Sequence, residues 1–427
     1  METWSNWAGS VTVTPTETVR PASVAEVQRV VADATGPVKA VGSGHSFTPI
    51  AVATGTQLRL DRLTGLVAVD RERCTATVLA GTTIAELNRL LDGQDMALSN
   101  LGDIDKQTIA GAIGTGTHGT GAAFTGLAGM VTALDLVTAD GEVRHLSAET
   151  PDELAAARVG LGALGVVTAL TLQCEPSYLL RAVERPAGLD EMLERFDDWV
   201  GGHDHAELYW FPHTRRVLTK TNDRVPGPAR PLSRTRAWID DELMSNRVFA
   251  GLQRAVTAVP RLAPKVNQLA SRALTARQYV DTSHRVFCAQ RRVRFHEMEY
   301  AIPRASLEHV LGEAQRWLDR TGETVAFPVE IRVAAPDDIW LSTGYDRANV
   351  YVAFHQYVAR DHSAYFAAVE AVLRDVDGRP HWGKLHTLTA ADLEKRYPRF
   401  GDFLAVRDRL DPDRRFANDY LRRVLGD

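Results

Sequence analysis

The sequence predicts an α+β fold in which two differently built regions follow one another. Short apolar strands alternate with amphipathic helices up to residue 176, where the pattern changes. Residues 293–373 read as strand, helix, strand, strand, helix, which is typical of helices packed on an antiparallel sheet. The length of 427 residues suits two or three domains rather than one core.

Local signals define the elements of the first region. Capping boxes at 23–26 and 83–86 predict helices, of which the first ends near Gly36-Pro37 and the second near residue 91. Strands are predicted at 38–41, 66–69, 75–79, 134–138 and 143–146, the last two as a hairpin with an Asp-Gly turn. Residues 102–121 have no hydrophobic period and are predicted as a loop, and 158–172 as close-packed buried backbone that runs into a strand.

The second region has longer periodic segments. Helices are predicted at 190–200, 305–318 and 363–373, and strands at 293–302, 324–334 and 349–358. Residues 222–236 are rich in Arg and Pro and are expected to form a surface excursion. The last forty residues are predicted as polar helix and turn, with a break at 411–413.

Composition excludes several functional classes. The net charge of −5 argues against a nucleic-acid-binding protein. No run approaches the roughly 18 apolar residues of a membrane span, and the N-terminus lacks the pattern of a signal peptide. The three scattered cysteines suit neither a disulfide framework nor a metal site, so we expect a cytoplasmic protein without a metal.

Two glycine-rich segments, 42–46 and 102–121, point to a large phosphate-bearing cofactor. Glycine lets successive backbone N–H groups approach a phosphate closely, although tight turns alone would explain such segments equally well. Neither segment is a Walker loop, and neither opens a helix in the manner of a Rossmann fingerprint. His45 ends the first segment, either as a histidine in a turn or as a nucleophile held beside the cofactor.

Five ordered motifs carry a resemblance to the vanillyl-alcohol-oxidase superfamily of FAD-linked oxidases. Its flavin motifs are matched by residues 40–47 (AVGSGHSF), 100–105 (NLGDID) with 110–121 (AGAIGTGTHGTG), and 161–167 (LGALGVV). Residues 381–384 (HWGK) and 410–418 (LDPDRRFAN) resemble the aldonolactone and alditol oxidase branch. The match covers nearly the whole chain and is weakest from 222 to 290.

The resemblance implies a two-part FAD-binding domain of the vanillyl-alcohol-oxidase type and an α+β cap domain built on an antiparallel sheet. We expect the FAD-binding domain at 1–176, the cap at 177–384, and a C-terminal segment, 385–427, that returns to the FAD-binding domain. The residues that match flavin contacts are Val41, Gly42, Ser43, Gly44, His45, Ser46, Gly102, Asp103, Gly111, Gly114, Thr115, Gly116, Thr117, His118, Gly119, Gly165, Val166, Val167 and Asn418.

Two of these positions imply specific chemistry. Relatives with histidine at the position of His45 bond it to the flavin 8α-methyl group, so we expect covalent FAD. Gly102 matches a position over the flavin edge where a larger side chain resembles a gate against oxygen, so glycine favours an oxidase. His118 is expected to be structural rather than catalytic.

The resemblance also assigns the substrate side. Glu330 and Arg332 alternate on one face of a strand and match residues that face the flavin. Lys384, Glu297 and His355 match further pocket positions, while Glu299 is expected to be structural. Alditol oxidases tend to carry threonine at the position of His355 and serine at that of Asp103, so these two residues favour a lactone over an alditol.

The expected reaction is oxidation of the CH–OH group of a sugar 1,4-lactone, of the L-gulono- or D-arabinono-1,4-lactone type, by hydride transfer to flavin N5, with O2 reduced to H2O2. Arg332, Lys384 and His355 would hold the hydroxyl, and Glu330 or His355 would take its proton. Three alternatives stay open: an alditol (xylitol or sorbitol) oxidase, a dehydrogenase with another acceptor, and a flavin binder without turnover. We expect a monomer or small oligomer.

Overall fold

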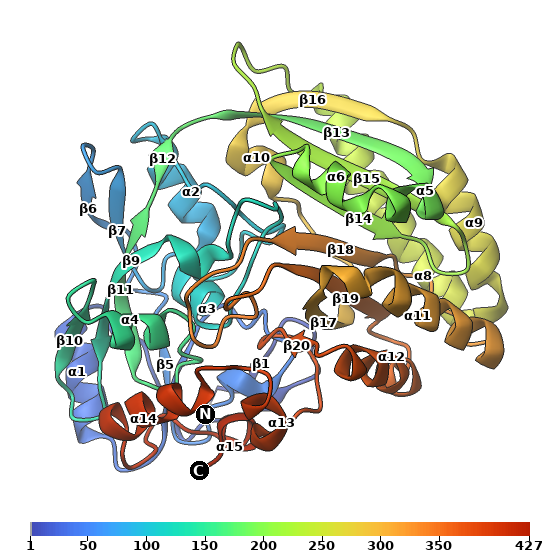
Figure 1. Cartoon of the computed structure of the whole chain (residues 1–427). Helices are drawn as coiled ribbons and strands as arrows, with labels where there is room; N and C mark the ends of the chain where they lie inside the picture. The colour runs from blue at the N-terminus through green and yellow to red at the C-terminus, as the bar shows by residue number, and fades with distance from the viewer. Residues whose placement is uncertain (1) are drawn as a thin grey trace.

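The computed structural model describes residues 2–427, with the side chains of all of these except 241 and 245 (Figure 1). Figure 1 shows the N-terminal and C-terminal parts of the chain packed together on one side and the middle of the chain on the other. The predicted α+β class is confirmed, because helices and mostly antiparallel sheets occur in both parts.

The N-terminal part contains two principal sheets. A parallel sheet has the order β3-β5-β4, formed by Glu17–Val19, Thr56–Arg59 and Val38–Val41. An antiparallel sheet has the order β10-β9-β11-β7-β6, formed by Val143–Leu146, Val131–Val137, Val166–Gln173, Thr75–Leu79 and Leu66–Asp70. Two short pairs are added by β1 (Trp4–Ser5) with β2 (Thr12–Val13) and β8 (Met96–Ala97) with β12 (Glu175–Pro176). Each of the five predicted strands is confirmed.

The helices of this part begin where the capping signals predict. In α1 (Val24–Asp33) the Ser23 side chain accepts from the Glu26 N–H, and in α2 (Ile84–Asp92) Thr83 accepts from that of Glu86. The prediction of loop throughout 102–121 is wrong for α3 (Ile109–Gly114). Its six residues are too few to display a helical period, yet Ile109, Ala112 and Ile113 are buried on one side of it. A further helix is α4 (Pro151–Arg158).

The middle of the chain builds one eight-stranded sheet in the order β16-β13-β15-β14-β18-β19-β17-β20. Its strands are Arg277–Thr282, Leu179–Gly188, Arg216–Arg224, His205–Trp210, Val329–Ala334, Asn349–Tyr357, Phe295–Pro303 and Arg379–Pro380. The predicted order of strand, helix, strand, strand, helix is confirmed as β17, α11 (Leu307–Thr321), β18, β19 and α12 (Ser363–Asp375).

Two local predictions in this part need correction. The single helix expected at 190–200 is divided into α5 (Leu189–Glu194) and α6 (Phe196–Gly201), because the backbone leaves helical geometry at Arg195. The surface excursion starts only after β15, which continues to Arg224 because it pairs along its length with β13. A helical arm then follows: α7 (Arg234–Ala237), the π-helix η3 (Trp238–Val248), α8 (Phe249–Ala258), α9 (Ala263–Ala273) and α10 (Ser283–Phe287).

The C-terminal segment forms α13 (Ala390–Glu394), α14 (Phe400–Leu410) and α15 (Asp419–Leu425). It contacts the N-terminal part through a bond from the Val38 N–H to the Arg415 carbonyl, 2.8 Å long. Asn418 caps α15 and donates to three carbonyls of the turn at 49–52. The domain boundaries at 176 and 384 stay a prediction. No described helix has both the length and the apolar character that a membrane span needs.

Candidate active site

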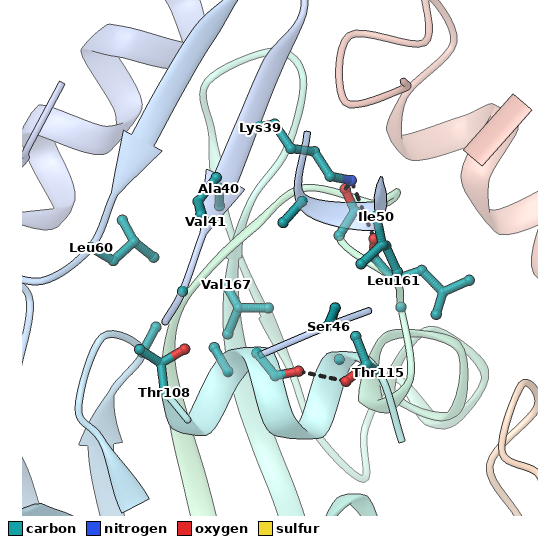
Figure 2. Close-up of a pocket in the computed structure, with 18 of the residues that line it drawn as sticks. Lys39, Ala40, Val41, Ser46, Ile50, Leu60, Thr108, Thr115, Leu161 and Val167 are labelled. Atoms are coloured by element: carbon teal, nitrogen blue, oxygen red, sulfur yellow. Dashed lines mark hydrogen bonds between the residues drawn. The ribbon is translucent and has the colours of Figure 1, made fainter. Parts of the chain in front are cut away.

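A pocket opens between β4, α3 and the loop before β11 (Figure 2). Eleven predicted cofactor residues line it: Val41, Gly42, Ser43, Gly44, His45, Ser46, Gly111, Gly114, Thr115, Gly165 and Val167. Apolar side chains such as Ile50, Leu60 and Leu161 complete the wall (Figure 2). An elongated cofactor with flat apolar rings and a polar middle suits such a lining.

The segment 42–46 offers a row of backbone donors in this wall. Its five N–H groups donate to no acceptor among the described residues. Successive free N–H groups form an anion-binding nest, and donors without a partner in the protein are available to a ligand in the pocket. The segment therefore fits the pyrophosphate of FAD.

Two glycines show how closely the backbone is packed around this site. A Cβ at Gly42 would lie 2.3 Å from Thr108 Oγ1, and one at Gly119 would lie 2.2 Å from Asn100 Oδ1. Gly44 has a φ of +72°, which side-chain-bearing residues rarely adopt. The tight turn is therefore compatible with phosphate binding, since the tight backbone is what presents the free donors.

The remaining predicted cofactor residues lie outside the pocket lining. Gly102, Asp103, Gly116, Thr117, His118 and Gly119 belong to loops between the pocket and the eight-stranded sheet, and the side chain of Val166 is buried in β11. Asn418 acts as a cap and as a support for the turn at 49–52. These residues shape the loops that carry the pocket lining.

His45 stands at the end of the donor row. Its ring stacks on Trp7 with centroids 5.8 Å apart. Burial, together with the nearby charge of Lys384, lowers the pKa of His45 to about 4. The imidazole is therefore neutral at pH 7 and keeps a nitrogen lone pair, as a nucleophile requires.

One face of the eight-stranded sheet gathers the predicted substrate residues. Glu330 and Arg332 lie on β18, opposite Ala353 and Tyr351 of β19, and His355 of β19 lies opposite Glu297 of β17. Directly paired residues of an antiparallel sheet point to the same side, so these side chains share one face with Glu299. The predicted alternation of Glu330 and Arg332 is confirmed by their ion pair of 2.6 Å.

Arg332 is held by three carboxylates. Its Nη2 donates to Asp103, at 2.9 Å, and contacts Glu330, while its Nε donates to Glu207 at 2.8 Å. Nη1 forms no hydrogen bond with any residue in the described part of the chain. The guanidinium is thus fixed in place and keeps one NH2 edge for a substrate oxygen.

The carboxylates around Arg332 differ in their basicity. Burial would raise the pKa of Asp103, but Arg332 and Arg291 hold it below its usual range. Burial outweighs Arg332 at Glu330, so the pKa of Glu330 lies above its usual value. Glu330 also accepts from the Tyr209 hydroxyl at 3.0 Å. Of these groups, Glu330 is the best proton acceptor.

A second cluster joins Lys384 to β17. Its Nζ contacts Glu297 in a short ion pair and lies 3.9 Å from Glu299. Burial would raise the pKa of Glu297, but Lys384 and His355 lower it to about 2. The Nδ1 of His355 is 3.0 Å from the Pro328 carbonyl, and its Nε2 is 3.5 Å from Glu297. Both ring nitrogens therefore face acceptor oxygens, which fixes the orientation of the ring beside Glu297.

His118 connects this cluster to the segment 102–121. Its Nε2 lies 2.9 Å from Glu299, its Nδ1 lies 2.8 Å from the Gly119 carbonyl, and its ring stacks on Tyr351 at 3.7 Å. These contacts link the loop of 102–121 to β17 and β19. They agree with structural roles for His118 and Glu299.

Sequence reasoning missed several residues that complete these clusters. Glu207 of β14 and Lys220 of β15 pair at 2.8 Å behind Arg332, and Arg291 pairs with Asp103 at 2.7 Å. In the pocket it missed Lys39 (Figure 2), whose Nζ donates to three carbonyls, at Leu161, Gly162 and Phe416. None of these residues belongs to a motif, and only the tertiary pairing brings them to the site.

Comparison with known proteins places this geometry in a family. The family model "D-arabinono-1,4-lactone oxidase" matches residues 170–424, and the model "FAD binding domain" matches residues 15–147. The chain is 42% identical to an L-gulono-1,4-lactone dehydrogenase of Mycobacterium tuberculosis over 99% of both chains. It is 35% identical to the L-gulonolactone oxidase of Bos taurus and 35% identical to an alditol oxidase of Streptomyces, over 99% of this chain and 98% of each relative.

Solved structures match the fold across the whole chain. A solvent-stable cholesterol oxidase superposes with a TM-score of 0.84 at 19% identity, covering 99% of this chain and 97% of the other. The cholesterol oxidase of Brevibacterium sterolicum gives a TM-score of 0.81 at 18% identity, with 99% and 96% covered. The predicted two-part flavin-enzyme fold is confirmed. The chain belongs to the D-arabinono-1,4-lactone oxidase family of FAD-binding oxidoreductases.

Proposed function

We propose that the chain oxidises the CH–OH group of a sugar 1,4-lactone of the L-gulono-1,4-lactone type. The observation that carries this proposal is Arg332, which is fixed by three carboxylates and keeps one free NH2 edge beside Glu330. FAD, when bound, supplies a two-electron acceptor for the substrate hydride.

The chain's own residues orient the substrate and manage its proton. Arg332 Nη1 and Lys384 donate to the reacting oxygen, where negative charge develops, and so stabilise the transition state more than the ground state. Glu330, with its raised pKa, accepts the hydroxyl proton. His355 positions Glu297 rather than acting as a base, because its two ring nitrogens face the Pro328 carbonyl and Glu297.

A lactone suits the site better than an open-chain polyol. Asp103 is engaged by Arg332 and Arg291, and His355 is engaged by Pro328 and Glu297. The resemblance implies that alditol oxidases tend to carry serine and threonine at these two positions. The test is to compare kcat/KM for L-gulono-1,4-lactone with that for xylitol, with a dye as acceptor. Faster turnover of the lactone is expected, and faster turnover of xylitol would refute the assignment.

We propose oxygen as the electron acceptor, because Gly102 leaves its position free of a side chain. The second candidate is a dehydrogenase, which is favoured by the 42% identity to a relative of that name. Oxygen uptake during lactone turnover distinguishes the two. A Cβ at Gly102 would lie 3.0 Å from the His118 carbonyl, so Gly102→Ala also displaces that loop and its dye-linked rate must be measured alongside.

We further propose that His45 carries FAD covalently at the 8α-methyl group. Support comes from its place in the pocket wall and its pKa of about 4, which leaves the ring neutral. Acid precipitation is expected to give a yellow pellet, and His45→Ala a yellow supernatant. A colourless pellet from the wild type would show that FAD is not bound covalently.

We infer a cytoplasmic location from the three cysteines, Cys74, Cys174 and Cys288, which are all free thiols. Separate measurement of the periplasmic and cytoplasmic fractions tests it. The oligomeric state is expected to be a monomer or a small oligomer, which gel filtration measures.

A further inference from the structure

The helical arm between β15 and β17 has an unusual charge distribution. Residues 243–276 contain five basic side chains and no acidic one, although the whole chain has more acidic residues (54) than basic ones (49). The five are Arg247, Arg254, Arg261, Lys265 and Arg272. Four of them, all except Arg247, form no ion pair with any residue that the structure describes.

The same arm carries most of the large apolar side chains that are exposed to solvent. Of the nine such side chains exposed in the described chain, seven lie between 238 and 269. They are Trp238, Ile239, Met244, Val248, Val259, Leu262 and Leu269, and the Leu269 side chain is 70% exposed. We call these seven side chains and the five cations the arm surface.

Helical spacing places cations and apolar groups together on the outer side of α9. Ala263, Asn267 and Ser271 are its buried residues, and Asn267 donates to the carbonyls of Pro212 and Val325. Lys265 and Leu269 lie two residues on either side of Asn267, about 200° away around the helix. They point away from the body of the protein.

The helix α8 has the same organisation. Its inner side is anchored by Gln253, which donates to the Ala326 carbonyl, and by buried Val256. Arg254 is exposed on its other side, and Val248 and Val259, which flank the helix, are exposed as well. Figure 1 shows α8 and α9 at the outer edge of the molecule, remote from α1 and α14.

We propose that the arm surface docks the protein onto a bilayer that contains anionic lipids. Basic side chains attract anionic headgroups, and the apolar side chains between them enter the boundary of the acyl region. Binding of this kind requires no span, in agreement with the absence of a spanning helix among those described. It goes beyond the oxidation proposed above and does not depend on it.

A second copy of the chain fits the arm surface poorly. A two-fold contact would bring the same patch onto itself, so five cations would face five cations. The acidic side chains of Asp240 and Glu242, next to Ile239, already pair with arginines of the same chain. Interspersed exposed apolar and basic groups suit the fluid boundary of an anionic bilayer.

The test is co-sedimentation of the FAD-loaded full chain with vesicles. Vesicles of phosphatidylcholine with about 30% phosphatidylglycerol are compared with vesicles of phosphatidylcholine alone. We expect binding to the anionic vesicles, and its loss at about 1 M salt, where the Debye length is about 3 Å.

Charge-reversal variants identify the surface. Replacing each cation is expected to weaken binding about fivefold, so the triple variant Arg261→Glu, Lys265→Glu, Arg272→Glu loses at least about 100-fold. The matched control reverses Arg29, Arg62 and Arg89, which are exposed on the N-terminal part, and is expected to bind like the wild type. Leu262→Ser with Leu269→Ser keeps the charge and is expected to cost about tenfold or more.

Four outcomes would overturn the proposal. They are no sedimentation with anionic vesicles at low salt, equal sedimentation with neutral vesicles, an equal loss in the control triple variant, and a wild-type dimer that Leu269→Asp dissociates. Far-ultraviolet circular dichroism and dye-linked turnover are measured for each variant to verify that it is folded. The sedimentation readout keeps its meaning whatever the substrate proves to be.

Discussion

Lys384→Met separates the electrostatic role of this lysine in folding from its role in turnover. Lys384 contacts Glu297 and lies 3.9 Å from Glu299, and its charge helps to lower the pKa of Glu297 from 4.5 to about 2. That shift corresponds to about 3 kcal/mol at about 1.36 kcal/mol per unit. Removing Lys384 leaves a buried carboxylate with His355, 3.5 Å away, as its remaining partner, so most of this energy is lost.

The loss of stability converts to a measurable shift in melting temperature. With an unfolding entropy of about 2.1 cal/mol/K per residue, a chain of 427 residues loses about 3 °C in Tm for 3 kcal/mol. Turnover of the lactone is expected to fall about 100-fold or more, because a preorganised donor to the reacting oxygen is removed.

The double variant Lys384→Met, Glu297→Gln is the control. A neutral amide needs no cationic partner, so this variant is expected to regain most of the Tm loss and none of the turnover. Differential scanning fluorimetry and dye-linked kinetics measure the two effects. Recovery of turnover in the double variant, or an unchanged kcat in Lys384→Met, would refute the reasoning.

Three further predictions follow from the same structure. Burial lowers the pKa of Lys39 from 10.5 to about 7, so between these pH values the unfolded chain binds this proton and the folded chain does not. The stability of the wild type should therefore rise from pH 7 to pH 10.5. The Tm of Lys39→Met should lack this rise with pH, and an equal rise in the variant would contradict the prediction. Gly119→Ala should lose bound FAD because its Cβ would meet Asn100 Oδ1 at 2.2 Å, whereas Gly36→Ala, with no atom within 4 Å, should keep its absorbance at the flavin maximum. Glu330 must be ionised to accept a proton, and its pKa lies above 4.5. The kcat/KM for the lactone should therefore fall as the pH drops through that raised value, and the residual activity of Glu330→Gln should not show this fall. A fall that persists in the variant would assign proton acceptance to another group.

The cofactor side could be predicted largely because its residues are contiguous in the sequence. The segment 42–46 presents its donors as a continuous row, and one short range supplies them all. Likewise, the alternation of Glu330 and Arg332 sufficed to place both on one face of β18. Periodicity failed for α3, which is shorter than two turns.

The support of Arg332 could not be predicted because it depends on strand pairing across the cap. Glu207 becomes a partner only because β14 pairs with β18, and Lys220 only because β15 pairs with β14. The helical arm escaped prediction for a different reason. In α9 the buried residues are small or polar (Ala263, Asn267 and Ser271) and Leu269 is exposed, so the usual apolar buried face is missing.

The central claim is that this site oxidises a sugar 1,4-lactone with FAD. The most direct measurement mixes the purified protein with L-gulono-1,4-lactone under anaerobic conditions and follows the visible absorbance of the flavin. The account predicts rapid bleaching by the lactone, much slower bleaching by xylitol, and none by the lactone in Arg332→Met. Bleaching by xylitol alone would contradict the substrate, and a flavin that neither compound bleaches would contradict the proposed reaction.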